Sequence, residues 1–161
     1  MAVHKLILDD AFSEAQFTLI AIHCNLEDYR LAYLLNKNLS ISLIRKPSDL
    51  QFNKGAVSYS IYNWDDENQQ VAWHLVSNLC KTEVLQDLDL NSLFKNQQKV
   101  IKSSYLLPEF KTVNYFLKID FEFSAAKLKL LVNNILKIPH IATAYGINMN
   151  DIKSKDNLIF S

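Results

Sequence analysis

The segment Leu107–Phe123, LPEFKTVNYFLKIDFEF, decides the fold because it joins a rigid turn to the clearest strand pattern in the chain. From Tyr115 onward the side chains alternate, with one apolar face and one polar face that consists of Lys118, Asp120 and Glu122. The apolar face consists of Tyr115, Leu117, Ile119, Phe121 and Phe123. A period of two residues is typical of a half-buried β-strand. Pro108 fixes its own φ and holds Leu107 out of the helical region, so the chain turns before the strand begins.

The turn carries a motif in the order Pro, Glu, Val, Tyr. Its members are Leu107, Pro108, Glu109, Val113, Asn114 and Tyr115. The run resembles the signature of the bacterial IPExxxVDY family, and the similarity extends along most of the chain. The resemblance implies a bacterial, cytoplasmic protein with genes for ribonuclease III and fatty-acid synthesis as neighbours, and it implies no mechanism.

Two motif positions depart from the family pattern. Leu107 replaces isoleucine and keeps an apolar side chain of similar size. Asn114 replaces aspartate, which removes any role that needs a negative charge but leaves a role in hydrogen-bonding a turn.

Glu109 has two interpretations. As a structural residue, its carboxylate accepts hydrogen bonds from donors around the turn, with Tyr115 as one candidate donor. As a functional residue, it is a buried acid. The sequence identifies no catalytic partner for it, so we favour the structural role.

The composition predicts one folded domain over residues 1–161, with a polar tail at about 150–161. Hydrophobic residues make up 49% of the chain and charged residues 21%, which excludes a disordered protein. Seventeen basic and 17 acidic residues give a formal net charge of zero, so no overall field attracts nucleic acid or an anionic membrane. We expect a cytoplasmic protein, because the chain has no signal-peptide pattern and no apolar run of membrane-spanning length.

Several kinds of chemistry lack support in the sequence. Gly55 and Gly146 are the only glycines, which excludes glycine-rich phosphate loops. Cys24 and Cys80 lie far apart in apolar settings, so we expect buried free thiols. The four histidines, His4, His23, His74 and His140, share no spacing typical of a metal site. We therefore predict no cofactor, no metal and no catalytic residues.

The remaining elements follow from periodicity and local signals. Residues 3–8 are too short to choose between strand and helix. Strands are expected at 17–24, 40–45, 99–106 and 141–147, with the strand at 99–106 antiparallel to the one from Val113. Helices are expected at 26–37, capped by Asn25, and from Ser124 to before Pro139. Residues 82–99 are expected to form a loop with one helical turn.

A hairpin is predicted on either side of a polar tip. Matching the apolar faces places Ile61 opposite Val71, Tyr59 opposite Trp73 and Val57 opposite Leu75. The tip contains Trp64, Asp65, Asp66 and Glu67. This group is either a solvated turn or a docking site for a basic surface of a partner.

The order of elements favours an α+β fold, with two helices packed on one mainly antiparallel or mixed sheet. Strand, helix and strand occur at 17–45 and again at 113–147, which suggests a repeated unit.

Two function classes fit these features. The first is a non-enzymatic interaction or adaptor module that binds another protein, because aromatic residues are abundant and catalytic chemistry is missing. The alternative is an RNA-associated protein, which would stack bases on sheet aromatics such as Tyr59 and Tyr62. It would also use a basic strip made of Lys37, Arg45, Lys46, Lys127, Lys129 and Lys137.

Overall fold

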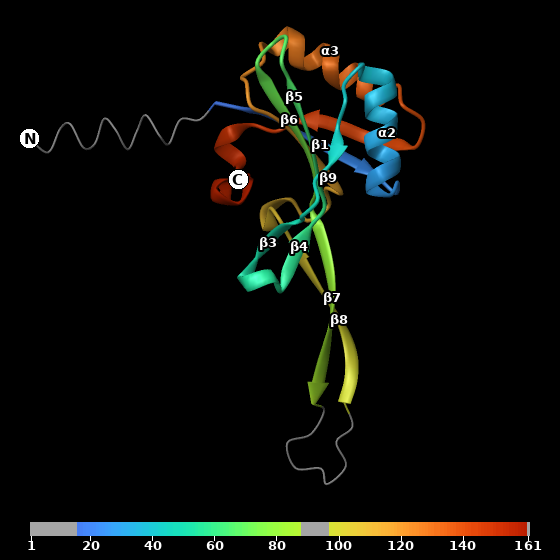
Figure 1. Ribbon diagram of the computed structural model, residues 1–161, viewed down its shortest axis with the longest axis vertical. Coiled ribbons are helices and arrows are strands. Elements are labelled where there is room, and N and C mark those ends of the chain that lie inside the picture. Colours follow the sequence, from blue (N-terminus) through green and yellow to red (C-terminus); the bar gives the residue numbers. More distant parts are fainter. Residues whose placement is uncertain (1–15, 88–96, 161) are drawn as a thin grey trace, which may run out of the picture.

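The computed structural model describes residues 16–87 and 97–160 and shows an α+β fold (Figure 1). Its centre is a six-stranded sheet in which all neighbouring strands are antiparallel. From edge to edge, the strands are β10 (Ile141–Gly146), β1 (Thr18–Cys24), β9 (Tyr115–Ile119), β6 (Val71–Ser77), β5 (Ile61–Asp66) and β2 (Ile44–Arg45). The predicted fold class is confirmed.

β1 and β9 lie inside the sheet, as the sequence predicts. Leu117 of β9 pairs with Ile20 of β1 and with Leu75 of β6. The expectation of a half-buried strand is wrong, because Phe116 on the second face is as completely buried as Leu117 on the first. A strand with neighbours on both edges and cover on both faces needs apolar residues at successive positions.

Two helices of the described chain cover the same face of the sheet, α2 (Asp28–Leu39) and α3 (Ala125–Leu136) (Figure 1). The cap predicted for the second helix is confirmed, because Ser124 Oγ accepts a hydrogen bond from the Lys127 N–H at 3.3 Å. The predicted cap of the first helix is wrong. Glu27, not Asn25, stands at its N-cap, and its side chain makes no capping hydrogen bond.

Each helix joins two strands that run in the same direction but are not neighbours. α3 leads from β9 to β10 with β1 between them, and α2 leads from β1 to β2 with β9, β6 and β5 between them. Both predicted strand–helix–strand segments therefore exist as split β-α-β units. The strand expected at 40–45 is shorter than predicted and comprises only Ile44–Arg45.

Short segments cover the opposite face of the sheet. They are the ribbon of β3 (Leu50–Phe52) and β4 (Val57–Tyr59) and the 3₁₀ turns η2 (Pro108–Phe110), η3 (Met149–Asp151) and η4 (Lys155–Leu158). The exposed 3₁₀ turn η1 (Asn53–Gly55) joins β3 to β4. The segment from about residue 150, predicted as a polar tail, packs against this face. Ile152 and Leu158 are buried in the second core cluster together with Leu107 and Phe116, so the tail contributes part of the apolar cover of this face.

β5 and β6 form the predicted hairpin in a different register. Ile61 pairs with Val76 rather than Val71, so all three predicted pairs are wrong. The cause is that the hairpin is buried on both faces, with Ile61 on one and Tyr62 on the other. Matching of apolar faces selects a register only where one face is polar.

β7 (Leu79–Asp87) and β8 (Gln97–Tyr105) form a second hairpin that projects away from the body, here called the projecting hairpin (Figure 1). The loop expected at 82–99 is wrong for the described residues. The strand expected at 99–106 exists, but it pairs with β7 and not with the strand after Val113. Asn78 alone separates β6 from β7, so the chain leaves the sheet at that residue.

Residues 3–8, for which the sequence left the state open, lie outside the described residues, as does His4. Within 16–87 and 97–160, the helices are too short and too polar to cross a membrane.

Candidate functional site

Asn78 holds the loop that carries the motif. Its side chain is completely buried. The Nδ2 atom donates to the carbonyl oxygens of Phe110 at 2.8 Å and Val113 at 2.9 Å, and the Oδ1 atom accepts from the Leu107 N–H at 2.9 Å. A single amide therefore satisfies three backbone groups of a loop that has few regular hydrogen bonds of its own.

The apolar members of the motif are core residues. Leu107 and Val113 are buried in the second core cluster. Pro108 begins the short turn η2, where its missing N–H costs no hydrogen bond. These three residues position the loop against the sheet and offer no reactive group.

Glu109 binds the C-terminal segment. Its Oε1 accepts hydrogen bonds from the backbone N–H groups of Lys153 and Ser154, both at 2.8 Å, and its Oε2 accepts from Ser154 Oγ at 3.1 Å. Burial raises the pKa of this carboxyl, but the hydrogen bonds from Ser154 and Lys153 outweigh it and hold the pKa below its usual value. The carboxylate is satisfied as the structural interpretation requires, by donors of the tail rather than by Tyr115.

Asn114 and Tyr115 connect the motif to the end of β1. Asn114 Oδ1 accepts from the Cys24 N–H at 3.0 Å, and the Tyr115 hydroxyl donates to the Leu26 carbonyl at 2.7 Å. Burial is the main cause that raises the pKa of Tyr115 far above its usual value, and the nearby Cys24 raises it further. The hydroxyl therefore stays protonated and can donate. Either asparagine or aspartate at 114 can accept the Cys24 hydrogen bond, because both carry a side-chain oxygen there.

Of the four residues predicted at the hairpin tip, only Glu67 lies in the turn. Trp64, Asp65 and Asp66 belong to β5, and the turn follows them. The Trp64 ring lies 6.1 Å from the Trp73 ring and packs against the first core cluster. Asp66 is buried, and its Oδ1 accepts from the N–H groups of Asn68 and Gln69, which fixes the turn.

The sequence gives no indication of a polar cluster that joins β6 to β9. His74 Nε2 lies 3.0 Å from Asp120 Oδ2, and Lys118 Nζ lies 2.7 Å from Asp120 Oδ1. Burial raises the pKa of Asp120, but hydrogen bonds from His74 and Lys118 prevail and lower it to about 2. The Phe160 ring covers both His74 and Lys118. The three residues are 46 positions apart at most, and only the strand pairing of His74 with Lys118 brings them together.

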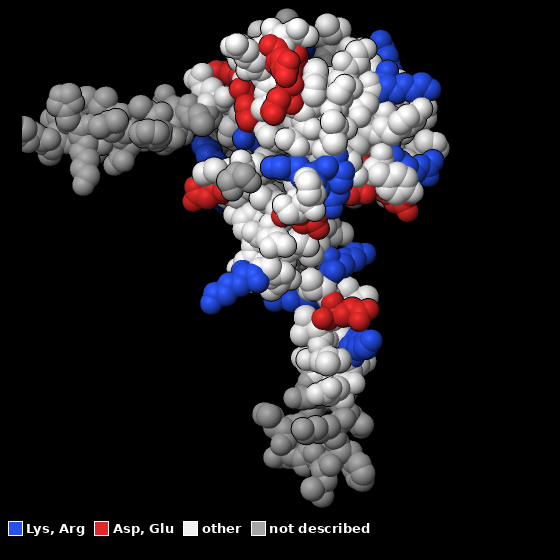
Figure 2. Space-filling view, viewed as in Figure 1, with Lys and Arg blue, Asp and Glu red and all other residues white. Residues whose placement is uncertain are grey.

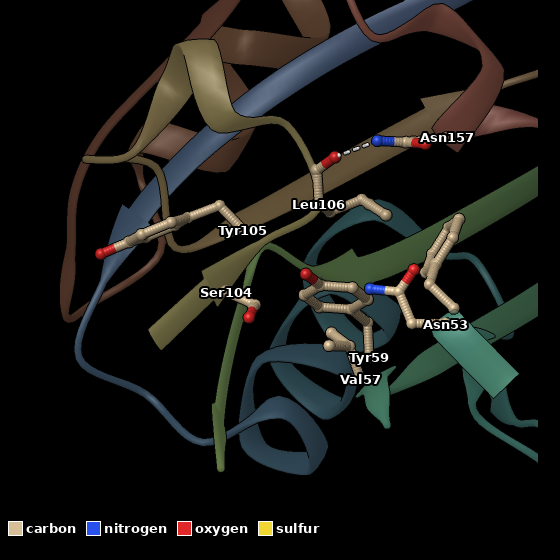
Figure 3. Close-up of a pocket in the computed structure, with 8 residues that line it drawn as sticks. Asn53, Val57, Tyr59, Ser104, Tyr105, Leu106 and Asn157 are labelled. Atoms are coloured by element: carbon tan, nitrogen blue, oxygen red, sulfur yellow. Dashed lines mark hydrogen bonds between the residues drawn. The ribbon is translucent and has the colours of Figure 1, made fainter. Parts of the chain in front are cut away.

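A small cleft without charged lining residues, here called the neutral cleft, lies at the base of the projecting hairpin (Figure 3). Its volume is about 220 Å³. It is lined by Phe52, Asn53, Tyr59, Ser104, Leu106 and Asn157 among others. Asn157 Nδ2 donates to the Leu106 carbonyl at 2.8 Å and closes one wall. Burial raises the pKa of Tyr59 to about 12, so its hydroxyl stays neutral.

A larger cleft of about 400 Å³, here called the cationic cleft, lies where β1 ends. Its lining includes His23, Cys24, Asn25, Arg30, Asn114 and His140. Cys24 is buried and burial raises its thiol pKa, so it is not an activated nucleophile. The motif residue Asn114 thus contributes to a cleft as well as to the fold.

The projecting hairpin gathers several exposed apolar residues on its two strands. Leu85 and Ile101 are 59% and 66% exposed on one face, and Val84 and Val100 are exposed on the other. Figure 2 shows acidic and basic side chains beside uncharged ones along this hairpin, while both charge signs are dispersed over the body. Apolar residues exposed on both faces of a two-stranded ribbon are unusual for a strand that serves only the fold.

The aromatic residues predicted to stack bases are not accessible. Tyr59 and Tyr62 are 3% and 7% exposed, so neither offers a free ring face to a nucleotide. In the predicted basic strip, Arg45 is paired with Asp49, and Lys127 lies over the Phe123 ring at 4.1 Å.

Two further predictions concern cysteines and metals. Cys24 and Cys80 are buried free thiols, as expected. Among residues 16–87 and 97–160, no cluster of three or more His, Cys, Asp or Glu side chains is arranged to hold a metal ion.

Comparison of the chain with protein-family models, curated proteins and solved structures finds no match.

Proposed function

We propose that the protein is a non-enzymatic interaction module that docks another protein through the projecting hairpin. The observation that carries this proposal is the exposure of Leu85 and Ile101 on a ribbon that extends beyond the body of the fold. Burying two such side chains against a partner removes apolar surface from water, which is the main source of affinity in protein association.

The pairing of the strands places the two residues together. Leu85 is opposite Lys99 and Ile101 is opposite Glu83, so Leu85 and Ile101 are diagonal neighbours on one face. The Lys99 ammonium lies 3.6 Å from the Glu83 carboxylate across the same face. An apolar pair beside exposed charges resembles the centre and rim of a small protein interface.

The backbone of the hairpin supports the same role. Within the described residues, β7 and β8 pair only with each other, so each strand has an edge of unpaired N–H and C=O groups. Such an edge can receive an extended segment of a partner as an added strand. The charged residues Lys81, Glu83, Lys99 and Lys102 discourage unspecific edge-to-edge pairing.

The neutral cleft gives the partner an anchoring position beside the hairpin. Ser104 and Tyr105 belong to β8 and line the cleft (Figure 3). The buried Tyr59 side chain lies at its wall. An uncharged side chain with one hydrogen-bonding group matches this lining.

The proposed relation to the IPExxxVDY family rests on the six motif residues. Their contacts support a structural role of the motif, since Glu109 binds the tail and Asn114 binds the end of β1. The resemblance supports a bacterial, cytoplasmic setting as part of the proposal.

Copurification of the full-length chain from its native host tests the proposal. We expect a stoichiometric protein partner that remains bound after ribonuclease treatment and is lost from a Leu85→Glu/Ile101→Glu variant. Leu130→Glu is the matched control, because Leu130 is 62% exposed but lies on α3.

Two results would overturn the proposal. Loss of the partner after ribonuclease treatment would favour the RNA-associated alternative. Equal loss in the Leu130→Glu control would show that the projecting hairpin is not the docking surface.

A further inference from the structure

The cationic cleft assembles from four segments that are distant in the sequence. His23 stands in β1, Arg30 in the first turn of α2, Asn114 in the motif loop, and His140 between α3 and β10. Two hydrogen bonds fix the motif loop to the end of β1, from the Cys24 N–H to Asn114 Oδ1 and from the Tyr115 hydroxyl to the Leu26 carbonyl. Two of the four segments that line the cleft are therefore held together by side-chain hydrogen bonds.

Two histidines, His23 and His140, line the cationic cleft. The pairing of β1 with β10 shifts its register between His23 and Cys24. The His23 ring lies beside Tyr145 of β10, and its Nε2 is 3.0 Å from the Tyr145 hydroxyl, which leaves Nδ1 for a ligand. His140 adopts φ 71°, in the left-handed region that non-glycine residues rarely occupy. The turn before β10 places His140 beside the cleft in this conformation.

The lining combines one guanidinium and two imidazoles with amide groups and contains no carboxylate. Glu27 and Asp28 precede Arg30 but do not line the cleft. Arg30 forms no ion pair with any residue of the described chain. The net charge of the chain is zero, but the lining of this cleft contains basic side chains and no acidic one.

The Asn114 side chain carries an NH₂ donor, which the aspartate of the family pattern lacks. Its Oδ1 is occupied by the Cys24 N–H, which assigns the other side-chain position to the NH₂ group. Within residues 16–87 and 97–160 this NH₂ donates to no protein atom. An aspartate at this position would keep the Cys24 hydrogen bond and place a negative charge at the cleft instead.

We propose that the cationic cleft binds the phosphate group of a small phosphorylated molecule. Guanidinium, imidazole and amide N–H groups are the donors that recognise phosphate oxygens. The volume of about 400 Å³ lies in the range of small-molecule sites and leaves room for more than the phosphate. This inference is independent of the projecting hairpin, so each can fail without the other.

Titration of the isotope-labelled full-length protein with inorganic phosphate and with phenyl phosphate tests the proposal by NMR. We expect saturable shifts at residues 23–30, 114 and 140–142, with tighter binding of phenyl phosphate than of inorganic phosphate. Arg30→Gln and Asn114→Asp are each expected to weaken binding at least about tenfold, the loss typical of one charged hydrogen bond. Lys37→Gln is the control, because Lys37 lies in the last turn of α2 and should leave the affinity unchanged.

The amide spectrum of each variant reports whether its fold is retained. If Arg30→Gln does not fold, Asn114→Asp still tests the site, because it keeps the hydrogen bond to Cys24. Shifts that do not saturate, or equal weakening by Lys37→Gln, would contradict the proposal. Tighter, Arg30-dependent binding of a single-stranded RNA oligonucleotide would also contradict it, because the ligand would then be a nucleic acid.

Discussion

The Glu109 carboxylate accepts a hydrogen bond of 2.8 Å from the backbone N–H of Ser154, which lies 45 residues further along the chain. This contact fastens the C-terminal segment across the face of the sheet that the helices leave open. Ile152 and Leu158, on either side of the contact, are buried there. The motif therefore stabilises the second core of the protein.

Substitution of Glu109 should destabilise this arrangement. In Glu109→Ala the N–H groups of Lys153 and Ser154 lose their acceptor, and we expect unfolding free energy to fall by about 1 kcal/mol because the site is half-exposed to water. Glu109→Gln keeps an acceptor oxygen and should lose less. Thermal unfolding of the two variants measures the difference. Unchanged stability in Glu109→Ala together with lost cellular function would refute the structural role and support a functional acid.

Asn78→Ala should be much more destabilising. It leaves the Leu107 N–H and the carbonyls of Phe110 and Val113 without partners in a buried loop. We expect a loss of about 3 kcal/mol or more in urea unfolding. Asn38→Ala is the control, because Asn38 makes an exposed hydrogen bond in α2 and should cost less than about 1 kcal/mol. Equal losses in the two variants would contradict the central role of Asn78.

Local signals in the sequence predict much of this fold. The apolar run of β1 and the alternation in β9 identify both interior strands, and Ser124 identifies the start of α3. These features depend on near neighbours in the chain, so they are visible without a structure.

Features that depend on segments distant in the sequence differ from the prediction or have no signal in the sequence. The β5–β6 register was wrong because both faces of that hairpin are buried. The projecting hairpin looked like a loop because its strands have no face that the core covers. The cationic cleft joins Arg30 to Asn114 and His140, and no spacing in the sequence indicates that.

The Asp120 cluster should make stability depend on acid pH. The ordinary pKa of 3.8 falls to about 2 in the folded protein, so the ionised carboxylate stabilises the fold above the ordinary pKa and loses this effect as pH falls toward 2. Because the side chain is 40% exposed, we expect Asp120→Asn to cost about 1 kcal/mol at neutral pH. Urea unfolding of this variant and of the wild type at several pH values should show the difference shrinking below the ordinary pKa. A difference that stays constant with pH would contradict the assignment, and Asp65→Asn, at an exposed carboxyl, should show little effect at any pH.

Substitutions on the projecting hairpin should leave the stability of the fold nearly unchanged. Leu85→Glu and Ile101→Glu replace side chains that are already in water, so we expect changes in unfolding free energy within about 0.5 kcal/mol. Thermal unfolding of the double variant measures this. A large loss would show that the two residues stabilise the fold, and their exposure would then no longer support a docking role.

Site-specific photo-cross-linking in living cells of the native host tests the docking role of the hairpin most directly. A photo-reactive residue at Ile101 should give one dominant adduct with a different protein, unchanged by ribonuclease. The same residue at Tyr33, which is 63% exposed on α2, should give no such adduct. An absence of adducts at Ile101, or the same adducts from both positions, would contradict the claim that this hairpin docks a protein partner.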